Sequence, residues 1–354
     1  MSYVIQGIQH IGIAVSDMDA SLKLYRKLFG LDMPFFDAEA PAPLMDSHCK
    51  GETIVKRASM VLNHQGGSAV EVISPTSFKP QGPVFAIRQG DLGIGSTMVK
   101  TPDIRKMHEH ALSVIPNTCD QEMVIDPLGR LTFFLRDFDG NLFQILESDN
   151  WFTNNGHPSG GVLGGTIGVS DMGNALKLYS NKLGYDKVLY DKKGVFEDWS
   201  HLPGGEQRYH RVLLTQSNRG AGGFSSLTGR TYIELVVALD RQGRFIFEDR
   251  IWADKGIVHL GFDVRGMNEL GKELQKEGFA FRCNTDSALS MGDHTSVHCT
   301  YIDDPDECWI EFIEVHKIPI VEKIGLFMNV QKQAPSKPFP KWMLLALKFN
   351  RIKD

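Results

Sequence analysis

VSDMDASLKLYRKLFGLD, at residues 15–32, returns as VSDMGNALKLYSNKLGYD at residues 169–186, which is 154 residues later and without a gap. A shared pattern of this length indicates an internal repeat. Alternating β-branched residues precede each copy, and a glycine, Gly30 or Gly184, follows the last residue of the helical apolar pattern. We therefore predict a strand followed by a helix in both halves of the chain.

Three β-rich runs follow each predicted helix, so the repeating unit is βαβββ. A weaker copy comes next in each half: LGIGSTMVK at residues 92–100 corresponds to IVHLGFDVR at residues 257–265. The ends of these copies also match, because FFLRDFDGNLFQILE at residues 133–147 aligns with TYIDDPDECWIEFIE at residues 300–314. The sequence therefore predicts an α+β protein of four βαβββ modules, at residues 7–76, 90–150, 161–240 and 255–317.

The modules group into two halves, as expected for a chain of 354 residues. We expect an N-terminal domain at residues 1–153 and a C-terminal domain at residues 161–317, joined by the Asn- and Gly-rich linker 154–160. The tail, residues 318–354, contains KWMLLALKFNRI, whose apolar residues have helical spacing. We expect this helix to dock on the body or on a second subunit.

The bulk composition limits the possible functions. Hydrophobic residues make up 42% of the chain, charged residues 23%, and the net charge is −5 without a long run of Lys or Arg. Nucleic acid and membrane surfaces are therefore not expected as partners. We expect a small-molecule substrate and a monomer or homodimer. We also expect a cytoplasmic location, because the N-terminus lacks the features of a signal peptide. The five cysteines form no C-x-x-C pair, so we expect free thiols without a chemical role.

A doubled βαβββ module that opens on a strand with His, closes on a strand with Glu and carries a D-P-D turn resembles the vicinal oxygen chelate superfamily. That superfamily includes glyoxalase I, methylmalonyl-CoA epimerase, extradiol dioxygenases and bleomycin resistance proteins. The resemblance implies that the modules form two U-shaped mixed sheets, the glyoxalase/dioxygenase fold. It also implies one divalent metal ion, ligated from the first and last strands of the modules.

The resemblance assigns the ligand positions module by module. The first-strand positions are His10, Gly95, Gly164 and His259, and the last-strand positions are Glu71, Gln144, Glu234 and Glu311. Only the first and fourth modules carry a full set, so we expect one metal held by His10, Glu71, His259 and Glu311. Two imidazoles with carboxylates suit Fe, Mn, Co, Ni or Zn. We expect the cavity of the second and third modules to have lost its metal.

The number of ligands separates the possible reactions. Four ligands resemble glyoxalase I and the epimerases: an isomerase, epimerase or lyase that transfers a proton next to a metal-bound carbonyl, with Glu71 or Glu311 as the base. Three ligands, His10, His259 and Glu311, would resemble a ring-cleaving dioxygenase acting on a catechol or hydroquinone. A third alternative is a non-catalytic small-molecule-binding protein. Glu71 favours the first reaction, because a dioxygenase substrate would compete with this carboxylate for the metal.

One motif supports the dioxygenase alternative. GDHTSVHCTYIDDPDECWIE, at residues 292–311, nearly fits the extradiol signature, in which His294 would be the acid/base and Tyr301 would bond the substrate oxygen. Two positions depart from that signature: Thr300 stands where an apolar residue is expected, and Glu307 replaces Gly or Pro. His294 and Tyr301 are therefore candidate catalytic residues.

Overall fold

The repeated stretch folds as a strand followed by a helix in both halves of the chain. β1 (Val4–Ala14) leads into α1 (Met18–Phe29), and β9 (Val162–Gly168) leads into α3 (Met172–Leu176), which continues as a π-helical turn at Lys177–Lys182. The structure is a computed structural model that describes residues 3–218, 222–285, 289–291, 295–321, 326–330, 334 and 336–352.

Both helices begin at the Ser-Asp pair of the repeat. The Asp17 carboxylate accepts a hydrogen bond from the Ala20 N–H at 3.0 Å, and Asp171 accepts one from the Asn174 N–H at 2.7 Å. These bonds satisfy N–H groups that have no partner inside a helix. α1 ends at Gly30, whose φ of 63° lies in the left-handed region that glycine adopts without steric cost.

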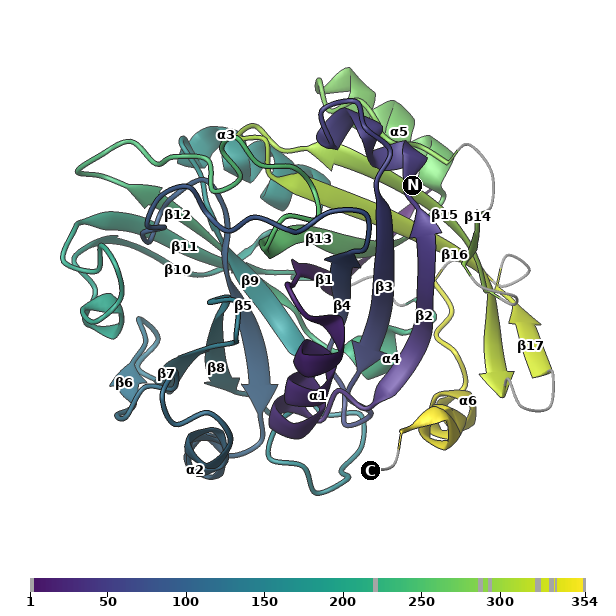
Figure 1. Ribbon diagram of the computed structural model, residues 1–354, viewed down its shortest axis with the longest axis horizontal. Coiled ribbons are helices and arrows are strands. Elements are labelled where there is room, and N and C mark those ends of the chain that lie inside the picture. The colour runs from purple at the N-terminus through teal and green to yellow at the C-terminus, as the bar shows by residue number, and fades with distance from the viewer. Residues whose placement is uncertain are drawn as a thin grey trace.

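The strands form two mixed sheets, named sheet A and sheet B (Figure 1). Sheet A contains, in spatial order, β14 (Leu289–Met291), β15 (Thr295–Asp303), β16 (Trp309–Val321), β13 (Gly256–Arg265), β1, β4 (Ala69–Pro75), β3 (Val55–Leu62) and β2 (Met33–Pro41), with β17 (Leu326–Asn329) beside β16. Sheet B contains β10 (Lys187–Gly194), β11 (Tyr209–Thr215), β12 (Tyr232–Ala238), β9, β5 (Gly93–Thr101), β8 (Leu142–Glu147), β7 (Leu131–Arg136) and β6 (Val124–Ile125). The predicted α+β fold of two curved mixed sheets is confirmed.

Each sheet combines one module from each half of the chain. Antiparallel pairing of β1 with β13 joins the first module to the fourth, and pairing of β5 with β9 joins the second to the third. The predicted division into residues 1–153 and 161–317 therefore does not coincide with a division between the sheets. The first and fourth modules, which carry the His and Glu pairs, lie side by side.

Few helices accompany the sheets. The remaining α-helices are α2 (Ile104–Val114), α4 (Ser225–Thr228), α5 (Met267–Lys276) and α6 (Lys341–Ala346). Short 3₁₀ helices are η1 (Pro43–His48), η3 (Glu197–Trp199) and η5 (Leu347–Asn350). None of the helices in the described ranges is long and apolar enough to cross a membrane.

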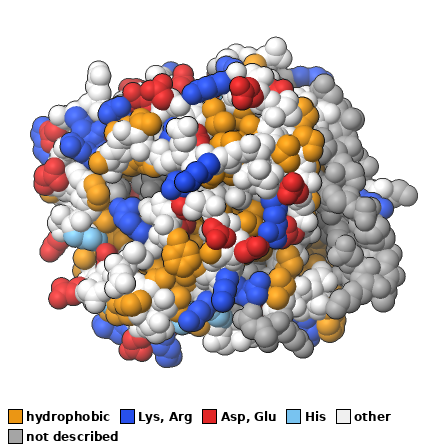
Figure 2. Space-filling view, viewed as in Figure 1, with side chains coloured by type: hydrophobic (Ala, Val, Ile, Leu, Met, Phe, Trp, Pro, Cys, Tyr) orange, Lys and Arg blue, Asp and Glu red, His pale blue; other side chains and the backbone are white. Residues whose placement is uncertain are grey.

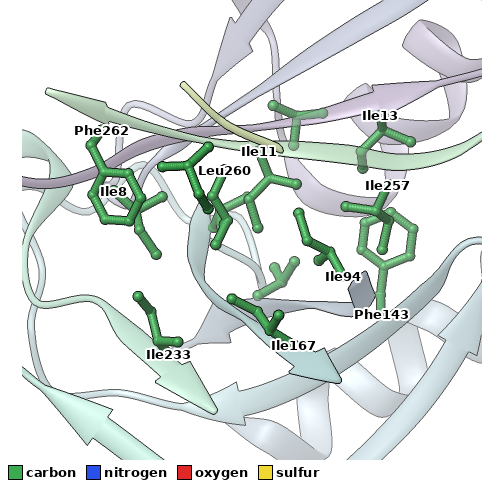
Figure 3. Packing of buried hydrophobic residues seen from close by; sticks show 14 of the residues in the cluster. Ile8, Ile11, Ile13, Ile94, Phe143, Ile167, Ile233, Ile257, Leu260 and Phe262 are labelled. Carbon is green, nitrogen blue, oxygen red and sulfur yellow. The ribbon is translucent and has the colours of Figure 1, made fainter. Parts of the chain in front are cut away.

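The main core lies between the two sheets. Ile11 and Leu260 of sheet A and Ile94 and Ile167 of sheet B pack together there, and each is at most 2% exposed (Figure 3). Strand side chains alternate between faces, so His10, next to Ile11, points to the opposite face of sheet A. The core therefore fixes the direction in which the predicted ligands point.

The C-terminal helix packs on sheet A. Met343 and Leu344 of α6 are buried with Leu62 and Val315 of the sheet. Beyond the helix, the chain is held by an ion pair of 2.5 Å between Arg351 and Asp32. On the face shown in Figure 2, Lys and Arg side chains are interspersed with Asp and Glu, so this face presents no region of a single sign of charge.

Candidate metal centre

Four side chains of sheet A converge on the face opposite the core. His10, Glu71, His259 and Glu311 each present one ligand atom, and these atoms lie within 4.8 Å of one another. His10 Nε2 is 2.9 Å from His259 Nε2 and 3.0 Å from Glu311 Oε2, and His259 Nε2 is 3.2 Å from Glu71 Oε2. Ligands that bind one ion at about 2.1 Å lie roughly 3.0–3.4 Å apart in octahedral or tetrahedral geometry. The spacing therefore fits one shared divalent ion.

Two glycines make room for the imidazole rings. His10 lies across from Gly261 in the antiparallel pair of β1 and β13, and His259 lies across from Gly12. A Cβ atom at Gly261 would lie 2.0 Å from the His10 ring, and one at Gly12 would lie 2.3 Å from the His259 ring. Any larger residue would displace the rings, so each His-x-Gly triplet supplies both a ligand and the space for its partner.

The centre concentrates negative charge away from water. Both histidines are 0% exposed, and Glu71 and Glu311 are each 6% exposed. Burial raises the pKa of Glu311, but the nearby charges of His259 and His10 outweigh it and lower the pKa to about 2. Burial likewise raises the pKa of Glu71, but a hydrogen bond from His259 and the charges of Lys56 and His259 together outweigh it and lower the pKa. Both carboxylates stay ionised, and buried charges need a counter-charge.

One ligand oxygen also lacks a satisfactory partner within the described residues. Glu311 Oε2 is buried and makes no aligned hydrogen bond there, although His10 Nε2 lies 3.0 Å from it. Buried polar atoms of this kind call for an explanation, and an ion is one of the usual ones. The donor set and this orphaned oxygen both fit a divalent metal.

Comparison with known proteins agrees with this centre. Residues 7–145 match the family model described as "Glyoxalase/Bleomycin resistance protein/Dioxygenase superfamily". Residues 7–145 belong to this superfamily. The resemblance to the vicinal oxygen chelate superfamily is thereby confirmed. None of the curated proteins matches the chain.

Solved structures extend the likeness to most of the chain. Glyoxalase I from Zea mays has a TM-score of 0.55 and 14% identity, with 88% of this chain and 93% of that chain covered. A putative dioxygenase from Bacillus subtilis subsp. subtilis str. 168 has a TM-score of 0.57 and 12% identity, with 88% of this chain and 86% of that chain covered. At such identities the likeness concerns the fold alone. Because a glyoxalase and a putative dioxygenase share this superfamily fold, the fold does not separate the two reactions.

A cavity of about 410 Å³ reaches the ligand carboxylates. Glu71 and Glu311 form part of its lining, and Phe36, Met45 and Trp252 contribute apolar walls. The concave, largely apolar shape with a few polar groups is typical of a small-molecule site. The protein can therefore enclose a small molecule against these carboxylates.

The structure describes only part of the motif at residues 292–311 that resembles the extradiol dioxygenase signature. Tyr301 lies across from Glu311 in the pair of β15 and β16, and its ring centroid is 5.6 Å from that of His259 in an edge-to-face contact. Burial and the charge of Glu311 raise its pKa well above the usual range. Tyr301 is thus a neutral residue beside the ligands, while His294 lies outside the described residues.

The structure adds three residues to the site that the sequence did not single out. The Cys299 thiol donates a hydrogen bond of 2.8 Å to Glu311 Oε1. The Trp252 ring stacks parallel to the His259 ring at 6.3 Å, and Lys56 Nζ lies 5.5 Å from the Trp252 ring centroid. Cys299 could have been found by strand alternation, because it lies two residues before Tyr301. Lys56 and Trp252 carry no local signal and reach the cavity only through tertiary structure.

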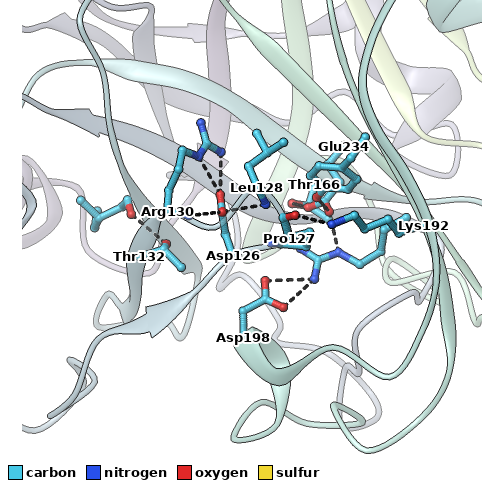
Figure 4. A network of polar contacts seen from close by, with 12 residues as sticks. Asp126, Pro127, Leu128, Arg130, Thr132, Thr166, Lys192, Asp198 and Glu234 are labelled. Carbon is cyan, nitrogen blue, oxygen red and sulfur yellow. Dashed lines mark hydrogen bonds and ion pairs between the residues drawn. The ribbon is translucent and has the colours of Figure 1, made fainter.

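The equivalent centre of sheet B holds an arginine. Arg211 Nε donates to Glu234 Oε1 at 2.6 Å, and its Nη1 lies 2.8 and 2.9 Å from the two oxygens of Asp198. Thr166 donates to Glu234 Oε2 at 3.0 Å, as Figure 4 shows, and Tyr190 donates to the other oxygen. The guanidinium therefore supplies, inside the protein, the positive charge that the carboxylates need.

The register of sheet B corrects one assigned position. Glu71 pairs with the residue two places after His10, and Gln144 pairs with Met98, so the position equivalent to His10 is Ser96. The sequence alignment placed Gly95 there. The pairing of β5 with β9 shifts register between Ile94 and Ser96, so Gly95 falls in an irregularity that sequence spacing does not show. Neither residue is a metal ligand of the superfamily type.

Proposed function

We propose that the chain is a divalent-metal-dependent isomerase, epimerase or lyase that transfers a proton next to a carbonyl group of a small molecule. The observation that carries this proposal is the position of Glu71, whose Oε2 lies 3.2 Å from His259 Nε2 within the four-residue set. A divalent ion held by these residues would supply a Lewis acid for the carbonyl. A ring-cleaving dioxygenase gains nothing from a fourth protein ligand, because it must leave room for both substrate and O₂.

The two carboxylates are suited to different tasks. Glu311 Oε1 accepts the hydrogen bond from Cys299, and Glu311 Oε2 faces His10. The contacts of Glu71 with His10 and His259 are made through Oε2, and Glu71 also lines the cavity. We therefore assign Glu71 as the base that takes the proton from carbon and returns it. Glu311 serves as a ligand.

The surroundings favour proton transfer without leakage to solvent. Phe36, Met45 and Trp252 wall the cavity beside the carboxylates, and such apolar walls strengthen charge interactions by keeping water away. Lys56 also lines the cavity, and its charge contributes to lowering the pKa of Glu71. The ammonium can additionally hold an anionic substituent of the substrate.

Deuterium exchange tests this proposal. Metal-loaded protein is incubated in D₂O with a panel of 2-oxo acids and α-hydroxy ketones, and proton NMR follows loss of the C–H next to the carbonyl. We expect metal-dependent exchange that Glu71→Gln slows by about 10²–10⁴-fold, the usual contribution of a general base. Glu109→Gln makes the same change on the exposed face of α2 and is expected to exchange at the wild-type rate. Exchange that is equally fast in Glu71→Gln would contradict the assignment.

The dioxygenase is the second candidate, because Tyr301 lies against His259 and lines the cavity. Its three-ligand site would keep its metal in Glu71→Ala, whereas the four-ligand site should lose affinity. Oxygen uptake by anaerobically iron-loaded protein with catechol or hydroquinone measures that activity directly. Uptake that persists in Glu71→Ala would replace the isomerase proposal with this one.

A further inference from the structure

A second cluster of reactive side chains lines the same cavity. Cys283, between α5 and β14, is partly exposed and lines the cavity together with Glu71 and Glu311. Its Sγ lies 3.2 Å from His48 Nδ1, and His48 Nε2 lies 3.0 Å from Asp303 Oδ1. The three residues come from distant parts of the chain, and none of them belongs to the metal centre. A thiol, an imidazole and a carboxylate in series is the arrangement of an activated nucleophile.

The geometry of the imidazole argues against a metal site here. Cys283 contacts one ring nitrogen of His48, and Asp303 contacts the other. The two nitrogens point in opposite directions, so one ion cannot bind the thiol, the imidazole and the carboxylate together. The same geometry suits a proton path, because one nitrogen faces the thiol while the carboxylate orients the ring through the other.

The ring of His48 is held in place and binds a proton more tightly than a free imidazole. Its side chain is 8% exposed and makes an edge-to-face contact with Trp309 at a centroid distance of 5.5 Å. Burial lowers the pKa of His48, but the hydrogen bonds with Asp303 and Cys283 outweigh burial and raise the pKa to about 9. Asp303 is itself fixed by an ion pair of 2.7 Å with Arg282. The ring can therefore hold a proton between the Asp303 carboxylate and the Cys283 sulfur.

The backbone at the thiol is strained. Cys283 has a φ of 48°, in the left-handed region that residues other than glycine seldom occupy. Such strain is common at functional sites, where it aims a side chain. Here it accompanies the placement of the thiol beside His48 at the cavity. Ser47 Oγ also lies 3.4 Å from the sulfur and 3.3 Å from the same ring nitrogen, and can share the hydrogen bond.

We propose that Cys283 is a nucleophile that forms a reversible adduct with the aldehyde group of a carbonyl compound held in the cavity. His48 is the base, and Asp303 is a positioning residue. The sulfur forms a bond to the aldehyde carbon, and the π bond of the C=O group breaks. His48 in its neutral form takes the thiol proton and passes it to the new alcohol oxygen. The product is a hemithioacetal, and the step needs neither an oxidant nor a further reactant.

The thiol reaction goes beyond the proposed function and can be tested apart from it. It uses none of the four proposed metal ligands, Glu71 included, so a failure of metal-dependent exchange would not contradict the thiol reaction. Conversely, an inert thiol leaves the metal chemistry untouched. Metal content is measured in each variant below to keep the two apart.

Alkylation tests the activation of the thiol. Wild-type protein is treated with iodoacetamide at pH 7, and peptide mass spectrometry follows each cysteine. We expect Cys283 to react about tenfold faster than glutathione. An ordinary thiol is only about 3% thiolate at this pH, whereas His48 can accept the proton of the Cys283 thiol. His48→Gln should remove this acceleration, and Asp303→Asn should reduce it severalfold. His110→Gln, the same change on α2, is the control.

Carbon NMR tests the adduct itself. Benzaldehyde labelled with ¹³C at the carbonyl suits the apolar walls, and its signal should move from the aldehyde region to that of a tetrahedral carbon on binding. Cys283→Ser should abolish the new signal. Wild-type Cys283 that alkylates no faster than glutathione overturns the nucleophile, and so does unchanged alkylation in His48→Gln. Fast alkylation without the tetrahedral signal, or a signal that persists in Cys283→Ser, overturns aldehyde capture.

Discussion

The arginine of sheet B allows a quantitative test of how the chain balances buried carboxylates. Arg211, Glu234 and Asp198 are each 1% exposed, and the guanidinium also stacks on Trp199 at 3.6 Å from the ring centroid. Arg211→Leu keeps an apolar side chain against Trp199 but leaves two carboxylates without their cation. Removing one partner of a buried ion pair costs about 3–5 kcal/mol, because the remaining charge stays in a poorly solvated site.

Urea denaturation monitored by tryptophan fluorescence measures this loss as a lower midpoint at an unchanged slope. The control is Arg208→Leu, because Arg208 makes an ion pair of 2.6 Å with Asp240 but its side chain is 64% exposed. We expect this control to keep the wild-type midpoint, since exposed pairs contribute little. Adding Glu234→Gln to Arg211→Leu should recover about 1–3 kcal/mol by removing one uncompensated charge.

The result that would refute the reasoning is an Arg211→Leu protein as stable as Arg208→Leu. It would mean that Glu234 and Asp198 are not held as buried anions. A midpoint that falls further when Glu234→Gln is added would also contradict the argument, because the glutamine carries no charge that needs balancing.

Three further predictions concern the metal centre. Removing metal by dialysis against a chelator should lower the thermal midpoint, and adding Mn²⁺ or Zn²⁺ at 100 times its dissociation constant should restore about 2.7 kcal/mol; an unchanged midpoint would argue against a site in the folded chain. Gly261→Ala should weaken metal binding at least about tenfold in isothermal titration, because the new Cβ would lie 2.0 Å from the His10 ring. Gly95→Ala is the control: a Cβ there would have its nearest contact at 3.9 Å, so this variant should bind metal as the wild type does. Metal affinity should rise as the pH is raised through and above about 6.5, the ordinary pKa of histidine. Burial lowers the pKa of His10 but Glu311 raises it overall, so His10 keeps a proton in the metal-free state at low pH. Metal binding must displace this proton, which costs less free energy as the pH rises through the raised pKa.

The fold and the clustering of His10, Glu71, His259 and Glu311 could be predicted from the sequence because both follow from local patterns. The repeat fixes where each module begins, and period-two alternation fixes the face of His10 and His259. The H-x-G triplets at His10 and His259 mark strands where a ring needs space opposite it, and the structure shows that space filled by the partner ring. In such cases a residue and its neighbours two positions away are enough to predict which way the side chain points and whether there is space beside it.

Other features could not be read because they depend on pairing between distant segments. Arg211 faces Glu234 from the neighbouring strand, and an arginine in a strand gives no sign of its partner. The thiol contact between Cys283 and His48 spans 235 residues, so neither stretch alone suggests chemistry. The sequence led us to assign the cysteines no role, and only the tertiary contacts place one of them beside a base.

The two centres differ in a way that point changes at the ligand positions would not reverse. In sheet A the buried carboxylates face two histidines in a set that fits a divalent ion, whereas in sheet B Arg211 is a cation fixed to the chain. A histidine at Gly164 would also meet the backbone, because even a Cβ there would lie 1.9 Å from the Tyr232 carbonyl oxygen. Restoring a metal to sheet B would therefore require removing the guanidinium and reshaping the pairing of β9 with β12. Two sheets of the same fold can therefore differ in how the charge of their buried carboxylates is balanced: by a bound ion in the centre proposed for sheet A, and by the Arg211 guanidinium in sheet B.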